Sequence, residues 1–218
     1  PMALKINNAT CKCQGVGAFW DMFFVMDQFG RVRPGPESLR LKRKRFGIVD
    51  VGSKTIDAYI SEGMEPVLGS EEVFDYGIRR AYQLVSDQLN NCPEQRIEKY
   101  YLDWLNTKEE LRENLDDLFW DGVYYSATEI VKLCRQAFAE VGTTVAQRMK
   151  ELWNAELAVL ELIVICGGGA LSMDFVEAFK KEFKNRIEVA SDPQFANCKG
   201  YVKSHKYHRI AQSLLKRM

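Results

Sequence analysis

Two glycine-containing turns carry the residues of this chain whose types and spacing could do chemistry. The first is Asp50-Val-Gly-Ser-Lys-Thr-Ile-Asp57, which comes directly after an apolar run. It begins with the carboxylate of Asp50 and continues with Gly52, Ser53 and Thr55. Glycine lets successive backbone N–H groups face a common point, and such a turn favours phosphate oxygens. A carboxylate beside a polyphosphate would suit Mg²⁺, which prefers oxygen ligands and usually keeps several waters. The turn therefore predicts a phosphate and magnesium site, although an ordinary glycine turn explains the same residues about as well.

The second turn, Cys166-Gly-Gly-Gly-Ala170, lies between the continuous apolar run 158–166 and the amphipathic stretch 172–183. Three consecutive glycines leave bare backbone at which a flat ligand can approach. The turn is not a Walker A loop, because no Gly-Lys-Ser/Thr follows, and its contiguous glycines do not fit the GxGxxG pattern. Taken alone it is a weak signal, since glycine at a joint between a strand and a helix often serves packing.

The elements around these turns predict an α/β architecture, in which strands alternate with helices. The expected strands are 46–50, 55–60, 158–166 and 187–189. Helices are expected over 14–29, through most of 75–153 with the longest starting at 127, over 172–183, and in a last region ending at residue 218. We expect a sheet-bearing subdomain of residues 1–73 and 157–218, with a mainly helical subdomain of residues 74–156 inserted in it.

Charge and composition restrict the classes of partner. Thirty basic residues balance thirty acidic ones, so the chain has no overall field that would attract nucleic acid or a membrane surface. No apolar run approaches the ~20 residues of a membrane span. Six cysteines are scattered without a CxxC pair, which favours reduced thiols in the cytoplasm. We therefore expect a cytoplasmic protein without direct contact to nucleic acid or membrane.

In their order and separation, the two turns resemble motifs of the superfamily of actin, sugar kinases and heat-shock chaperones. The first turn resembles the second phosphate motif, and Val164-Ile-Cys-Gly-Gly-Gly-Ala170 resembles the adenosine motif. The segment Ser191-Asp-Pro-Gln-Phe-Ala-Asn-Cys-Lys-Gly-Tyr201 resembles the one that follows the adenosine motif in bacterial and archaeal ParM/StbA-type plasmid-segregation actins. Gln14-Gly-Val-Gly-Ala18 resembles their inter-domain connecting helix, so the resemblance runs from about residue 14 to residue 201.

The resemblance implies ATP and Mg²⁺ as cofactors. Asp50 would hold magnesium through water and help to order the hydrolytic water, and Gln14 would polarise that water unless it is only a helix-entry residue. Lys54 stands where the family usually carries a small residue, so it would either reach the phosphates or point outward. The implied nucleotide-binding residues are Gly52, Ser53, Lys54 and Thr55 for the phosphates and Gly167, Gly168, Gly169 and Ala170 for the adenosine.

The resemblance also implies a fold and a role. The fold would be the ribonuclease-H-like C-terminal domain of an actin-like ATPase that self-associates into filaments and moves plasmid DNA through an adaptor protein. The family's first phosphate motif is not found in the sequence, so the N-terminal ATPase domain is expected to be absent and the chain alone inactive. Two alternatives stay open, a small-molecule kinase of the sugar type and a non-catalytic fragment that caps filaments.

Overall fold

A mixed sheet forms the centre of the fold in the computed structural model, which describes residues 15–36, 38, 44–63 and 65–215. Its strand order is β10-β9-β3-β4-β5, and β6 also pairs with β4. The strands are β3 (Arg45–Val51), β4 (Ile56–Glu62), β5 (Glu65–Pro66), β6 (Glu72–Phe74), β9 (Leu160–Cys166) and β10 (Ile187–Val189). Strand β9 runs parallel to both β3 and β10, whereas β3 and β4 form an antiparallel hairpin. The carboxyl ends of β3 and β9 therefore lie at the same edge of the sheet.

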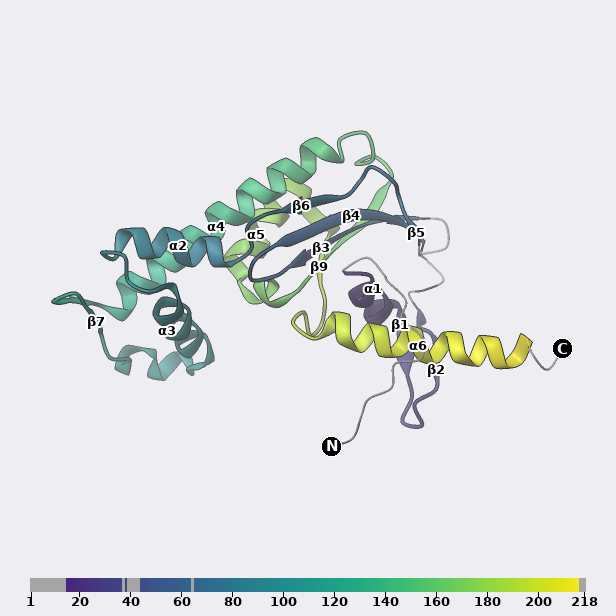
Figure 1. The fold of residues 1–218 in the computed structure, drawn as a ribbon, viewed down its shortest axis with the longest axis horizontal. Coiled ribbons are helices and arrows are strands. Elements are labelled where there is room, and N and C mark those ends of the chain that lie inside the picture. Colours follow the sequence, from purple (N-terminus) through teal and green to yellow (C-terminus); the bar gives the residue numbers. More distant parts are fainter. Residues whose placement is uncertain (1–14, 37, 39–43, 64, 216–218) are drawn as a thin grey trace, which may run out of the picture.

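Helices cover both faces of this sheet because alternate residues of β3 point to opposite sides. Val49 and Val51 belong to a core shared with α4 (Ala127–Leu152) and α5 (Met173–Phe183). Phe46 and Ile48 instead contact α1 (Val16–Phe23), which lies against α6 (Ala196–Leu215) on the other side of the sheet (Figure 1). Among the described residues, no helix combines the length and apolar character needed to cross a bilayer.

A helical arm extends from one end of the sheet (Figure 1). It consists of α2 (Arg79–Gln88), α3 (Glu94–Asn106), the 3₁₀ helix η2 (Glu109–Asn114), the hairpin of β7 (Leu118–Trp120) and β8 (Val123–Tyr125), and the first turns of α4. One hydrophobic core continues from the arm into the sheet, and α4 packs against α2 and α3 as well as α5. The division at residues 74 and 156 into separate subdomains thus stays a prediction.

The helix predicted over 14–29 is shorter in the structure, where α1 ends at Phe23 and β1 (Phe24–Met26) forms a hairpin with β2 (Val32–Pro34). The Asp27 carboxylate accepts the backbone N–H groups of Phe29 and Arg31, both at 2.9 Å, and these bonds hold the turn. Local side-chain bonds of this kind compete with helix propagation. The remaining predicted strands and helices are confirmed within a few residues of their ends.

Helices α1 and α6 cross with backbone against backbone. A Cβ atom added at Gly200 would lie 1.6 Å from the carbonyl oxygen of Gly17, and one at Gly17 would lie 2.3 Å from the carbonyl oxygen of Asn197. Beside the crossing, the Lys203 ammonium lies 2.7 Å from the carboxylate of Asp21, with both side chains largely buried. Two glycines therefore set how closely α6 approaches α1.

Buried acidic groups in the core predict that the fold loses stability in alkali. Burial raises the pKa of Tyr101 from 10.0 to about 12 and that of the Cys134 thiol from 9.0 to about 12. Because the unfolded chain ionises these groups first, their contribution is complete below about pH 9 and is lost as the pH rises toward 12. We expect the urea midpoint of unfolding to fall steadily above about pH 9 and Cys134→Ala to reduce the slope. A midpoint that does not change between about pH 8 and about pH 11 would contradict this expectation.

Candidate functional site

The two glycine turns predicted to act together meet at the carboxyl edge of the sheet. Asp50 on β3 lies opposite Cys166 on β9 in the parallel register. Gly167 follows directly, with a left-handed φ of 84°. A Cβ atom there would lie 2.5 Å from the carbonyl oxygen of Val51 and 2.6 Å from Oδ1 of Asp50. Only glycine allows this approach, so the strand pairing brings the carboxylate of the first turn directly against the second turn.

The first turn is a tight hairpin whose tip is exposed. The N–H of Gly52 donates to the carbonyl of Thr55 at 3.0 Å and closes the turn. Ser53 and Lys54 are exposed at the tip, whereas Thr55 is half-buried and its hydroxyl lies 3.3 Å from the Asp57 carboxylate. The Gly52 N–H is thus already used within the turn, and the exposed Ser53 hydroxyl is the donor best placed to meet a ligand.

The hairpin is fixed to the helical arm. The carbonyl oxygens of Gly52 and Ser53 accept the N–H groups of Ile78 and Arg79, both at 3.0 Å, where α2 begins. These are donors that a helix leaves unpaired at its N-terminus. Lys54 borders the hollow beside this junction, together with Gly77 and Arg79. Its exposed position fits the outward orientation, one of the two that the sequence leaves open.

Among the glycines of the second turn, Gly168 is the one whose backbone is open to a ligand. Gly168 is exposed, and a Cβ atom added to it would meet nothing within 4 Å. Gly169 and Ala170 are buried, and a Cβ at Gly169 would lie 2.3 Å from Cγ1 of Val51. The Gly167 N–H donates to the carbonyl of Pro193 at 2.9 Å. The turn is therefore held by its first and third glycines, and its second is open.

The Asp50 carboxylate is oriented by hydrogen bonds although it is only 3% exposed. The Asn197 amide donates to Oδ2 of Asp50 at 2.8 Å. Burial raises the pKa of the neighbouring Cys166 thiol well above its ordinary value, and the charge of Asp50 and a hydrogen bond to it add to that effect. A buried carboxylate is tolerated when it is hydrogen-bonded in this way.

These residues fit a phosphate-bearing ligand better than a metal ion held by protein alone. In the described part of the chain, no group of three or more His, Cys, Asp or Glu side chains is arranged to hold a metal ion. The buried Asp50 carboxylate, with Asp57 opposite it on β4, belongs to the same pair of turns as an exposed hydroxyl and an open glycine backbone. Such a donor set suits Mg²⁺ that keeps waters and shares phosphate oxygens.

Two contributors to the site were not predicted from the sequence. Pro193 and Asn197 both lie in the segment 191–201 and contact Gly167 and Asp50. That segment resembles a segment of the plasmid-segregation actins, but the resemblance implied no role for either residue. Of the predicted residues, Gln14 lies outside the described part of the chain. The others lie in the two turns that the parallel strands β3 and β9 bring together.

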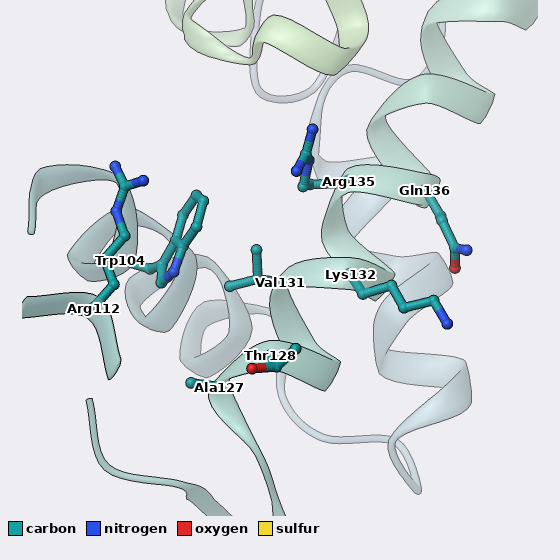
Figure 2. A pocket seen from close by; sticks show the side chains of 8 residues that line it. All are labelled: Trp104, Arg112, Ala127, Thr128, Val131, Lys132, Arg135 and Gln136. Atoms are coloured by element: carbon teal, nitrogen blue, oxygen red, sulfur yellow. The ribbon is translucent and has the colours of Figure 1, made fainter. Parts of the chain in front are cut away.

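A hollow of about 540 Å³ lies on the helical arm (Figure 2). The Arg112 guanidinium lies 4.2 Å from the ring centre of Trp104, and in Figure 2 the Trp104 ring is drawn between Arg112 and Val131 of α4. Arg135 is in turn 3.2 Å from Asp174 in the first turn of α5. The lining residues are Trp104, Arg112, Ala127, Thr128, Val131, Lys132, Arg135 and Gln136. Through Asp174, this cationic hollow is connected to the helix that follows the second turn.

Comparison with known proteins gives a consistent family and fold. Residues 48–181 match the family described as archaeal actin homologue MreB-like, C-terminal. The structure is similar to the archaeal actin homologue Ta0583, with a TM-score of 0.68 and 15% identity over 90% of this chain and 55% of that one. It is also similar to the subunit of a 15-stranded ParM filament from Clostridium botulinum, with a TM-score of 0.63 and 20% identity over 94% of this chain and 55% of that one.

A further similar structure is the complex of Ta0583 with ADP, with a TM-score of 0.60 and 15% identity over 90% of this chain and 57% of that one. The chain thus spans about half the length of these solved structures. No curated protein matches its sequence. The fold is therefore that of an actin-like C-terminal domain, as the sequence predicted.

Proposed function

The chain belongs to the family of C-terminal domains of archaeal MreB-like actin homologues. On this premise we propose that it forms one wall of the ATP site in an actin-like, filament-forming ATPase. The observation that carries the proposal is that the open Gly168 backbone and the Asp50 carboxylate lie at the carboxyl ends of the adjacent parallel strands β9 and β3. Ligands of open α/β sheets bind outside the carboxyl ends of such strands.

Each residue of this wall has a proposed task. The Gly168 backbone packs against the nucleoside, with Gly167 and Gly169 holding the turn. The hydroxyls of Ser53 and Thr55 contact the β- and γ-phosphates. Asp50 orders the waters around Mg²⁺, and the bound metal supplies charge neutralisation of the phosphates. Gln14 is proposed to polarise the attacking water.

Support for nucleotide binding and assembly comes from the similar proteins, of which one is a complex with ADP and another is a filament subunit. A ParM-type role, in which filaments move plasmid DNA through an adaptor, is our proposal for the whole protein. Because the chain spans about half of those structures, catalysis requires a second wall. We expect the chain alone to bind ATP weakly and to hydrolyse it negligibly.

The direct test is calorimetric titration of the 218-residue chain with ATP, with and without Mg²⁺. We expect Mg²⁺ to strengthen binding, and Asp50→Ala to reduce that gain about tenfold because the charged group that orders the waters of the metal is lost. Asp87→Ala, which removes an exposed carboxylate on α2, is the matched control and should leave the gain unchanged. ATP binding that is absent, or indifferent to Mg²⁺ in the unaltered chain, would contradict the proposed site.

Sedimentation with and without ATP tests assembly separately. Pelleting that depends on nucleotide, in the chain or in a longer protein that carries both walls, supports the filament. A chain that stays in the supernatant but blocks pelleting of that longer protein supports a cap instead. Filaments form when subunits join head to tail through a contact that does not close into a ring. A stable closed dimer of the longer protein would therefore contradict the proposal.

A further inference from the structure

The segment that follows β10 contacts both turns of the site and the helix beside them. The carbonyl of Pro193 accepts the N–H of Gly167 at 2.9 Å. Gly200, one helical turn further along α6 than Asn197, lies against the backbone of Gly17 on α1. Between these two contacts the Asn197 side chain reaches Asp50. The segment therefore connects the second turn, helix α1 and the buried carboxylate.

Helix α1 lacks a cap of its own, and Asn197 supplies a bond in its place. The residue before the helix is Gly15, which has no side chain to accept an N–H of the first turn. Instead the N–H of Ala18 donates to Oδ1 of Asn197 at 2.9 Å. Helices leave their first N–H groups without intrahelical partners, and a side-chain oxygen that accepts one is stabilising. Here that oxygen comes from α6, 179 residues away in the sequence.

The other end of the same amide donates to Asp50. Its Nδ2 lies 2.8 Å from Oδ2, while Oδ1 is the oxygen that a Cβ at Gly167 would approach to 2.6 Å. The amide thus determines which carboxylate oxygen faces α6 and which faces the second turn. A neutral amide donates this bond without cancelling the negative charge, whereas a lysine would neutralise the carboxylate and compete with a cation.

We propose that Asn197 is a positioning residue that holds the Asp50 carboxylate in the orientation required for magnesium-bound nucleotide. This inference rests on the proposed function. The amide uses its acceptor to fix itself to the N-terminus of α1 and its donor to fix the carboxylate. The Asp50 carboxylate is 3% exposed, and the Asn197 side chain is half-buried beside it. Loss of the amide leaves a buried carboxylate with one partner fewer and α1 without its cap.

The first test separates positioning from general stability. Nucleotide affinity is measured with and without Mg²⁺ for the unaltered chain, for Asn197→Ala, and for Cys198→Ser, which alters the exposed neighbouring side chain on α6. For Asn197→Ala we expect the strengthening by Mg²⁺ to fall about tenfold while metal-free affinity changes less than about twofold. Cys198→Ser should match the unaltered chain. An equal loss with and without Mg²⁺, or no loss in either, would overturn the positioning role.

The second test uses urea unfolding and a reciprocal exchange, and it does not depend on nucleotide. Asn197→Asp sets two carboxylates against each other and should lower the urea midpoint. Adding Asp50→Asn restores a donor and an acceptor in exchanged places, so the midpoint should recover. The recovered double variant should still lack the strengthening by Mg²⁺, because the charge has moved away from position 50.

The two tests fail in distinguishable ways. If the unaltered chain shows no Mg²⁺-dependent nucleotide binding, the proposed function fails, and the urea experiment still decides whether the amide holds the carboxylate. If Asn197→Asp unfolds at the midpoint of the unaltered chain, or if Asp50→Asn does not restore the midpoint, the proposed contact is wrong even when nucleotide binds.

Discussion

Gly168→Val is expected to weaken nucleotide binding strongly while leaving the fold intact. A Cβ atom added at this residue meets no atom within 4 Å, and the backbone there is not left-handed. The added side chain would instead occupy the space from which we propose that the nucleoside approaches. We expect the affinity for ATP to fall by about 100-fold, or about 2.7 kcal/mol, and the free energy of unfolding to change by less than about 1 kcal/mol.

The measurement pairs calorimetric titration with urea unfolding for three variants. Gly168→Ala adds only a methyl group and should stabilise the fold slightly, because alanine restricts the unfolded chain. Gly167→Ala should be destabilising, since its φ is 84° and its Cβ would lie 2.5 Å from the Val51 carbonyl oxygen. Unimpaired ATP binding by Gly168→Val would show that the ligand does not approach this backbone.

The meeting of the two turns could be predicted from the sequence because it depends on strand direction alone. The apolar runs ending at Asp50 and Cys166 read as buried strands, and parallel strands in one sheet bring their carboxyl ends together. In the structure these two strands are neighbours, with Asp50 opposite Cys166. Which of the glycines is open to a ligand was less predictable, because it depends on residues outside the turn. That Gly168 alone of the three glycines is open depends on Val51 and Ile78, which come from other elements.

The role of Asn197 illustrates a contact that no local pattern encodes. Its two partners, Asp50 and Ala18, are 147 and 179 residues away in sequence. An asparagine inside a helical stretch reads as a poor helix former or a surface residue. Its effect appears only when the crossing of α1 and α6 places the amide between the Asp50 carboxylate and the N–H of Ala18. Tertiary geometry, and not propensity, decides such a residue.

The shortened helix α1 has a different cause. The apolar residues Val25 and Met26 continue the helical pattern, but they pair with Arg33 and Val32 in a hairpin. The turn that makes this hairpin depends on one carboxylate, Asp27, and on Gly30 with a φ of 75°. Hydrophobic periodicity over so short a stretch does not separate a helix from a strand.

The crossing of α1 and α6 is the packing feature on which the position of Asn197 depends, and Gly200→Ala is expected to disrupt it. The added Cβ would lie 1.6 Å from the Gly17 carbonyl oxygen and 2.8 Å from the Asp21 backbone nitrogen. Since both partners are helical backbone, neither can move aside as a side chain would. The helices must separate, which we expect to cost about 3 kcal/mol of unfolding free energy by overpacking.

Separation of these helices should also reduce nucleotide binding, because Asn197 lies one helical turn before Gly200 and would be carried away from Asp50. Urea unfolding and Mg²⁺-dependent ATP titration of Gly200→Ala measure the two effects. The same glycine-to-alanine replacement at Gly168, where the space is open, is the matched control and should show the opposite sign in stability. The higher helix propensity of alanine favours Gly200→Ala and opposes the cost of the clash. If the variant were nevertheless as stable as the unaltered chain, the close crossing of α1 and α6 would not be what holds Asn197 in place.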